Sequence, residues 1–143
     1  MQQRTFEEVR ESLRGKVILV ANRSIPARRI SRSIRERFEA IAAITATDID
    51  KTEPAAASAQ ELILLGADPR AYLDLPRIIR LARERGCVAI HPGWGFASED
   101  NNFPKLCTEA GITFIGATAE AMHLLGNKVE ARRVARSLGI PVV

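Results

Sequence analysis

The chain has 143 residues, 46% of them apolar, and this size and composition predict one domain with a complete hydrophobic core. Its 21 basic and 17 acidic side chains give a net charge of +4. The arginines are spread along expected helices beside acidic residues, which indicates a solvated surface and no nucleic-acid partner. No apolar run is long enough for a signal peptide or a bilayer span, so we expect a cytoplasmic protein with no membrane partner.

Short apolar runs alternate with segments of helical spacing along the whole chain. The runs are expected strands and comprise, in chain order, 16–20, 40–44, 62–65, 87–90 and 112–115. The expected helices cover 5–14, about 26–38, 75–85, 98–110, 118–126 and 127–138. Residues 48–58 are expected to form a loop with a short helix. This alternation predicts an α/β fold with a Rossmann-like open parallel sheet and helices on both faces. We expect strands 16–20, 62–65, 87–90 and 112–115 in the sheet interior.

The run from His91 to Glu99, which reads HPGWGFASE, follows directly after strand 87–90. A glycine-rich turn after a strand is where open α/β sheets bind their ligands, because glycine permits a sharp turn and a close approach of the backbone. The alternative is a simple connection in which Trp94 is a half-buried plug. The candidate substrate pocket consists of Gly93, Trp94, Gly95 and Glu99.

The segment after the loop is expected to begin a helix at Ser98, whose hydroxyl would cap it and leave Glu99 in the first turn. Glu99 would then either contact the site or stabilise its own helix terminus. Pro104 is expected to make this helix irregular, because proline has no N–H to donate. His91 is interpreted as a positioned structural histidine or a catalytic one. His123 is interpreted as a partly exposed helix residue.

The two cysteines, Cys87 and Cys107, form no CxxC pair and fall in an expected strand and an expected helix. They are interpreted as small buried apolar groups in a reducing compartment. The sequence shows no cluster of histidine, cysteine and carboxylate ligands, so no metal-ligating residue is assigned.

Three strings in combination resemble the N-terminal domain of biotin carboxylase, the ATP-grasp component of biotin-dependent carboxylases. They are the HPGWGFASE run, Val20-Ala21-Asn22-Arg23, and the segment 125–131, which reads LGNKVEA. The resemblance implies a Rossmann-like pre-ATP-grasp domain over 15–143, preceded by a helical extension over 1–14. The last residues, 140–143, resemble the start of a strand that is cut off, so we expect a fragment without the ATP-grasp domain.

The resemblance also implies roles for individual residues. Lys128 corresponds to the family lysine that contacts the phosphates of ATP, and Asn127 replaces the family aspartate before it. Trp94 stands where the family usually has a tyrosine near biotin and bicarbonate. Arg29 and Arg32 match positions that line the dimer contact in bacterial enzymes.

One string departs from the family pattern. The family sequence Asn-Arg-Gly-Glu-Ile-Ala becomes Asn22-Arg23-Ser24-Ile25-Pro26-Ala27 here, which loses a glycine and a glutamate beside the expected ligand crevice. This change is consistent with a divergent subfamily or a different assembly.

The reaction implied by the resemblance is the ATP- and bicarbonate-dependent carboxylation of biotin, with Mg²⁺ or Mn²⁺ at the phosphates. The implied partners are a biotin carboxyl carrier protein or domain, a carboxyltransferase component and a second copy in a homodimer. The fragment alone is expected to be inactive. The alternatives are another ATP-grasp ligase, of the carbamoyl-phosphate synthetase or purine-pathway type, and a non-catalytic interaction domain. A dinucleotide-binding domain is disfavoured, because no GxGxxG follows the first strand.

Overall fold

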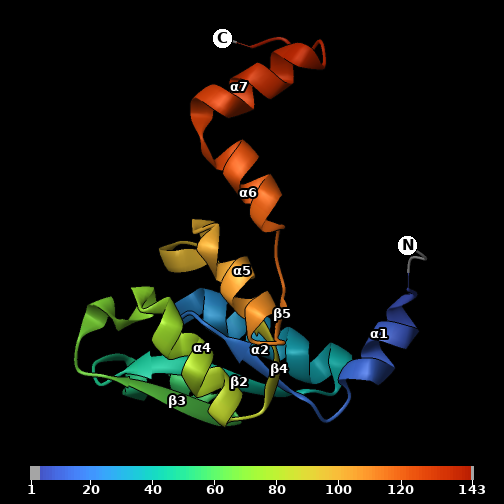
Figure 1. The fold of residues 1–143 in the computed structure, drawn as a ribbon. Coiled ribbons are helices and arrows are strands. Elements are labelled where there is room, and N and C mark those ends of the chain that lie inside the picture. Colours follow the sequence, from blue (N-terminus) through green and yellow to red (C-terminus); the bar gives the residue numbers. More distant parts are fainter. Residues whose placement is uncertain (1–3, 143) are drawn as a thin grey trace.

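The computed structural model describes residues 4–142, and its centre is a five-stranded parallel sheet (Figure 1). The strands are β1 (Val17–Val20), β2 (Ile41–Thr47), β3 (Glu61–Gly66), β4 (Cys87–His91) and β5 (Thr113–Phe114). Their order in the sheet is β3-β2-β1-β4-β5. The predicted fold class is therefore confirmed, although β3 and β5 lie at the edges and the expectation of interior positions for them is wrong.

Strand β2, which takes an interior position, is longer than the apolar pattern predicted. Its last residues include Thr45 and Thr47, which are fully buried although they are polar. The hydroxyl of Thr45 donates to the carbonyl oxygens of Val20 and Asn22 at 3.4 and 3.3 Å. Because these hydroxyls are satisfied inside the fold, the strand continues past the point where its sequence turns polar.

Helices cover both faces of the sheet, with α2 packed in one core and α4 and α5 in the other. The helices of the described residues are α1 (Phe6–Leu13), α2 (Ser24–Phe38), α3 (Pro54–Ala57), α4 (Leu75–Glu84), α5 (Asn102–Glu109), α6 (Ala119–Gly126) and α7 (Lys128–Ser137). In the described residues, short 3₁₀ turns lie between strands and the helices α3, α4 and α5 that follow them: η1 (Asp50–Thr52), η2 (Pro69–Leu73) and η3 (Phe96–Glu99). Alternate residues of β1 enter opposite cores, because successive strand side chains point to opposite faces. Ile18 packs with Ala27 of α2, whereas Leu19 packs in the cluster that holds Ile78 of α4 and Phe103 of α5.

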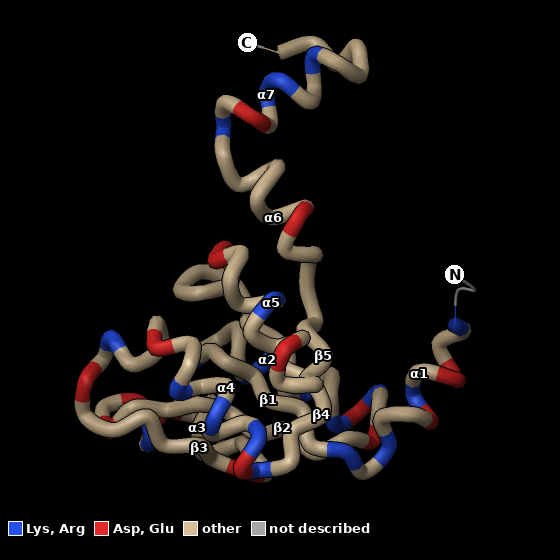
Figure 2. Tube along the Cα trace, in the orientation of Figure 1, with Lys and Arg blue, Asp and Glu red and all other residues tan. Residues whose placement is uncertain are grey.

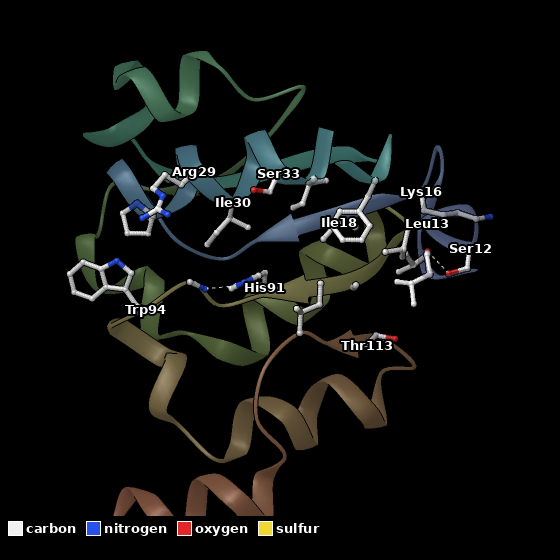
Figure 3. Close-up of a pocket in the computed structure, with 18 of the residues that line it drawn as sticks. Ser12, Leu13, Lys16, Ile18, Arg29, Ile30, Ser33, His91, Trp94 and Thr113 are labelled. Atoms are coloured by element: carbon white, nitrogen blue, oxygen red, sulfur yellow. Dashed lines mark hydrogen bonds between the residues drawn. The ribbon is translucent and has the colours of Figure 1, made fainter. Parts of the chain in front are cut away.

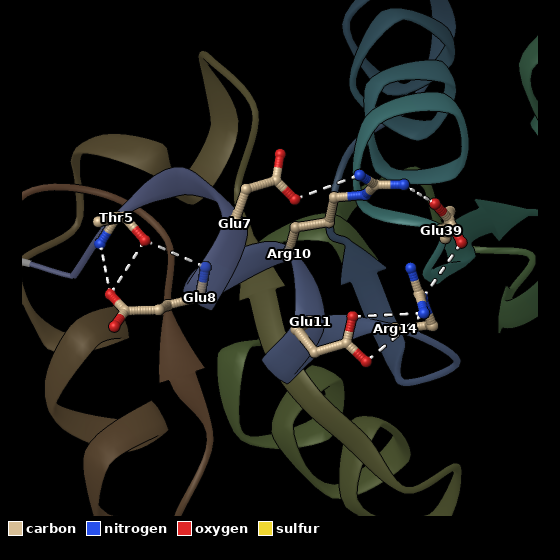
Figure 4. A network of polar contacts seen from close by, with 7 residues as sticks. All are labelled: Thr5, Glu7, Glu8, Arg10, Glu11, Arg14 and Glu39. Carbon is tan, nitrogen blue, oxygen red and sulfur yellow. Dashed lines mark hydrogen bonds and ion pairs between the residues drawn. The ribbon is translucent and has the colours of Figure 1, made fainter.

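The N-terminal helix α1 packs against the end of α2 (Figure 4). A capping box between Thr5 and Glu8 begins the helix, as the sequence predicted for Thr5. Arg10 and Arg14 both pair with Glu39, which follows α2 in a left-handed conformation. The extension is thus attached to the domain by charged contacts and by Leu13, which packs against the core.

The last two helices extend away from the sheet (Figure 1). Thr118 caps α6 and Asn127 caps α7, as predicted, but neither helix contains a buried residue. Basic and acidic residues intersperse along most of the trace (Figure 2). Among the helices described between residues 4 and 142, none is both long and apolar enough to cross a membrane.

The segment expected as one helix over 98–110 is instead divided into η3 and α5, so the predicted capping role of Ser98 is wrong. Phe96 has a φ of +48° and opens the short turn two residues earlier than predicted, which leaves Glu99 at its end. The carboxylate of Asp100 then accepts from the N–H of Asn102 at 2.8 Å, and α5 begins there. Pro104 therefore lies in the first turn of α5, where its missing N–H has no intrahelical partner to lose, and the expected irregularity does not occur.

Candidate functional site

The adjacent carboxyl ends of β1 and β4 form the place where the chain switches direction across the sheet. From β1 the chain leads to β2 on one side, and β4 returns on the other. Such switch points are where open α/β sheets bind ligands. The predicted loop lies here: Gly93 and Gly95 follow β4 with φ values of +70° and +68°, which favour glycine.

Asn22, at the end of β1, is the residue that holds the first half of this loop. Its side chain is fully buried and its amide donates to the carbonyl oxygens of Pro92 and Trp94, at 2.7 and 3.0 Å. No role was assigned to Asn22 from the sequence. The feature of the sequence that could have indicated this role is the position of Asn22, a polar residue shortly after a buried strand.

Trp94 is 73% exposed, so the alternative interpretation as a half-buried plug is wrong. It stands at one end of a groove of about 830 Å³ between α2, α1 and the strands β4 and β5 (Figure 3). Arg29 lies at the same end, whereas Lys16 lies at the opposite end, and Gly93 also lines the groove. The structure thus places Trp94, predicted for the substrate pocket, and Arg29, predicted for the dimer contact, at the same end of the groove. The lining between the two ends is mainly apolar.

The remaining predicted site residues lie outside this groove. Glu99 is exposed at the end of η3. Arg32 points to solvent on α2 and pairs with Glu36 at 3.0 Å. Lys128 is exposed as the first residue of α7, on the part of the chain that extends away from the sheet.

A second cluster that sequence reasoning missed holds the other half of the loop. Arg23 pairs with the buried Asp50 at 2.9 Å, and its guanidinium lies 5.5 Å from the ring centroid of Phe96. The other Asp50 oxygen accepts from the hydroxyls of Tyr72 and Thr47, at 2.8 and 2.5 Å. The ring centroids of Tyr72 and Phe96 are 5.1 Å apart. No spacing in the sequence connects these residues, since Asp50 lies in the segment expected to be a loop.

The electrostatics of this cluster follow from its hydrogen bonds. Burial alone raises the pKa of the Asp50 carboxyl, but the bonds donated by Thr47, Tyr72 and Arg23 outweigh burial and hold the pKa below its ordinary value. Burial and the bond to Asp50 raise the pKa of Tyr72. Asp50 is therefore a carboxylate and Tyr72 a neutral donor at neutral pH.

His91 closes β4 and supports the turn that follows it. Its Nδ1 accepts from the N–H of Gly93 at 3.0 Å, and burial lowers the pKa of the imidazole. A neutral ring with an accepting Nδ1 carries its proton on Nε2. The bond from Gly93 gives His91 a structural contact in the turn, and the imidazole also lines the groove beside Trp94.

The structure shows where the three residues that depart from the family string after Arg23 lie. Ser24 has a φ of +53°, a left-handed conformation that glycine adopts without strain and that costs an L-residue energy. Its hydroxyl donates to Glu53 at 2.8 Å. Ile25, which replaces the family glutamate, is exposed and lines the groove, and Pro26 fits in the first turn of α2.

The two cysteines are buried and free, as expected. Burial raises the pKa of each thiol to about 11, so neither is a reactive thiolate at neutral pH. The exposed position of His123 on α6 also matches its predicted character.

The sheet order, the helices on both faces and the glycine loop at the switch point define a doubly wound α/β domain with a ligand crevice. A sequence model described as "Biotin carboxylase, N-terminal domain" matches residues 14–122. The chain therefore belongs to the biotin carboxylase N-terminal domain family. Lys128 lies beyond the matched residues.

Curated relatives and solved structures agree with this membership. The chain is 40% identical to the mitochondrial pyruvate carboxylase of Rattus norvegicus over 90% of this chain and 11% of that protein. It is 39% identical to the biotin carboxylase of a Nostoc species over 88% of this chain and 28% of that protein. The biotin carboxylase domain dimer of Hydrogenobacter thermophilus 2-oxoglutarate carboxylase, solved with MgADP, ADP and bicarbonate, is similar with a TM-score of 0.86. That similarity has 38% identity and covers 90% of this chain and 28% of that one.

The coverage shows how much of an enzyme this chain represents. The chain spans between 11% and 28% of the length of the curated relatives it matches. It is the N-terminal domain of the biotin carboxylase architecture, and most of each relative lies outside the similarity.

Proposed function

We propose that this chain is the N-terminal part of a biotin carboxylase that carboxylates biotin with ATP and bicarbonate. Residues 15–143 are the domain itself and residues 1–14 a helical extension. The observation that carries the proposal is the glycine loop at the switch point, with Trp94 exposed beside the groove in a member of this family.

In this proposal Gly93, Trp94, Gly95 and Glu99 form one wall of the pocket for biotin and bicarbonate. The glycines allow a ligand to approach the backbone closely. The exposed indole of Trp94 offers a flat apolar face and one N–H donor, which suit a small ring with polar edges. Trp94 lacks the hydroxyl that a tyrosine would supply. A ligand group that would accept a hydrogen bond from that hydroxyl must accept one from the indole N–H or from water instead.

The nucleotide is proposed to contact Lys128. This residue is exposed at the start of a ten-residue helix, and its ammonium can donate charge-assisted hydrogen bonds to phosphate oxygens. Asn127 already accepts from the N–H groups of Val129 and Glu130, so the lysine ammonium is the principal donor left for an anion. ATP supplies the phosphoryl group that activates bicarbonate.

Mg²⁺ or Mn²⁺ is proposed to bind with the nucleotide outside this domain. Between residues 4 and 142, no three histidine, cysteine or carboxylate side chains gather where they could hold a metal ion. Protein ligands for the metal would therefore come from residues beyond this domain. The chain alone supplies one wall and one phosphate contact, and we expect it to be inactive by itself.

The proposed partners follow from the same assignment. They are a biotin carboxyl carrier protein or domain, a carboxyltransferase component and a second copy that meets the α2 surface around Arg29 and Arg32. Arginine suits such a contact because its planar guanidinium binds carboxylates with two hydrogen bonds. The free thiols of Cys87 and Cys107 are compatible with the reducing cytoplasm, where we place the protein.

A chimeric carboxylase tests the proposal. This chain replaces the matching N-terminal region of the Nostoc biotin carboxylase, and phosphate release from ATP is measured with and without free biotin and bicarbonate. We expect biotin-dependent ATP hydrolysis by the chimera and none by the same enzyme lacking its N-terminal region or by the 143-residue chain alone. A folded chimera without biotin-dependent turnover, or turnover by the isolated chain, contradicts the proposal.

A further inference from the structure

Two consecutive residues at the end of β1 hold opposite halves of the loop that follows β4. Asn22 contacts the half that contains Pro92 and Trp94, and Arg23 contacts the half that contains Phe96. The two residues are joined locally, because the side-chain oxygen of Asn22 accepts from the N–H of Arg23 at 2.9 Å. The residues that follow β1 therefore contact both halves of the loop that follows β4.

The contact of Asn22 with the loop is steric as well as polar. A Cβ added at Gly93 would lie 2.5 Å from Nδ2 and 2.7 Å from Cγ of Asn22, which is closer than real atoms approach. The Asn22 side chain therefore fills the space that a side chain at position 93 would need. Its amide also donates to the carbonyl oxygens on either side of Gly93, so a displacement of Gly93 would strain one buried and one partly buried hydrogen bond.

The contact of Arg23 depends on a buried anchor. Asp50 is buried and fixes the guanidinium at 2.9 Å, while Tyr72 holds Asp50 from the other side and packs on Phe96. Phe96 is kept in a left-handed conformation that a bulky residue adopts only when its surroundings require it. The second half of the loop is therefore held by packing and charge.

We infer that Asn22 and Arg23 are positioning residues that fix the backbone on either side of Trp94 and thereby set the direction in which its exposed indole points. Trp94 is 73% exposed, and the backbone that carries it sets the direction of its Cα–Cβ bond and so the region that the indole can reach. Only the assignment of biotin or bicarbonate as the ligand that contacts the indole rests on the proposed function. The positioning itself is a property of this chain and can be measured without activity.

The first test uses the single tryptophan of the 143-residue chain. Asn22→Asp keeps the shape of the side chain but replaces the amide donor by a carboxylate facing two carbonyl oxygens. We expect a lower heteronuclear NOE of the one indole N–H signal and a weaker near-ultraviolet circular dichroism band of tryptophan, with unchanged far-ultraviolet dichroism. Asn102→Asp, at an exposed asparagine, is the matched control and should leave both signals unchanged. An Asn22→Asp chain that folds and keeps both signals overturns the inference.

A second pair of variants covers the case in which Asn22→Asp does not fold. Gly93→Ala is compared in the parent and in the Asn22→Ala background, where the two closest atoms have been removed. We expect the loss of denaturation midpoint caused by Gly93→Ala to be smaller in the Asn22→Ala background. Equal losses in both backgrounds would show that Asn22 does not fill the space at Gly93, and the inference would fail.

The third test separates positioning from simple stability in the chimeric carboxylase. Asn22→Asp and Arg23→Lys should each raise the KM for biotin by about tenfold while the KM for ATP stays within about twofold. Equal changes in both KM values, or none, contradict a role in orienting Trp94. If the parent chimera is inactive, the proposed function fails while the indole measurements still decide the positioning.

Discussion

The hydroxyl of Ser24 donates a 2.8 Å hydrogen bond to Glu53 while the backbone of Ser24 holds a φ of +53°. The left-handed conformation costs an L-residue on the order of 1–2 kcal/mol, more than an exposed hydrogen bond returns. We therefore expect Ser24→Gly to raise the free energy of unfolding by about 0.5–1 kcal/mol in urea denaturation. Ser33→Gly, at an ordinary helical position of α2, should lower it by about 0.5 kcal/mol. A loss of stability in both variants would show that Ser24 is not strained.

The buried Asp50 depends on its donors. Tyr72→Phe removes one of them without changing the shape of the ring, and we expect a loss of about 1.5–3 kcal/mol in the free energy of unfolding, because the lost bond goes to a charged group. Thr108→Val is the control, since its hydroxyl donates a neutral bond to the Pro104 carbonyl at 2.9 Å. Equal losses in the two variants would mean that Asp50 does not need the tyrosine hydroxyl.

The lowered pKa of His91 predicts a pH dependence of stability. As the pH falls through about 6.5, the unfolded chain binds a proton at this imidazole while the folded chain does not, so the folded state loses stability until the lower folded pKa is reached. The stability advantage of the parent over His91→Asn should therefore shrink between about pH 7.5 and about pH 5.5. His123→Asn serves as the control on an exposed helix. A constant difference between parent and His91→Asn would contradict the prediction.

Lys128 is predicted to act on the nucleotide. In the chimeric carboxylase, Lys128→Ala should raise the KM for ATP and lower kcat, a combined loss on the order of 1.5–3 kcal/mol in transition-state stabilisation. Lys105→Ala, at an exposed lysine of α5, provides the matched control. Steady-state kinetics with ATP varied would refute the assignment if the two variants behaved alike.

Glu99 is predicted to act on the other substrates. Glu99→Gln should change the KM for bicarbonate or biotin more than the KM for ATP, because Glu99 ends the loop that carries Trp94. Glu109→Gln, at the end of α5, removes an exposed carboxylate outside the loop and should change none of the three constants. A Glu99→Gln enzyme with parent kinetics would leave Glu99 only the role of a solvated surface group.

The periodic parts of the fold were predictable because they follow from burial. The alternation of Ile18 and Leu19 between two cores is implied by a continuous apolar strand, and the caps at Thr118 and Asn127 are short-range chemistry. The break at Asp100 was not predictable, because it depends on Phe96 adopting a left-handed conformation against a tyrosine distant in sequence.

The candidate site was predictable only where glycine indicates a backbone conformation that other residues rarely adopt. Gly93 and Gly95 indicated a sharp turn, but the side chain that fills the space beside Gly93 comes from Asn22, at the end of another strand. The Asp50 and Tyr72 pair is equally non-local, and its members lie in segments without periodic signal. Contacts between distant parts of the chain thus set the details that residue spacing leaves open.

Helices α6 and α7 contain no buried side chain, and helices of this length are marginal in water without tertiary packing. Their persistence in the isolated chain depends on caps and on pairs such as Arg133 with Glu130. Hydrogen exchange should consequently separate the chain into two parts near Gly116. Backbone amides of the sheet should exchange slowly, whereas amides after Gly116 should exchange rapidly through local opening of α6 and α7. A protease would then release a trimmed body that retains Trp94 and its supports but has lost Lys128.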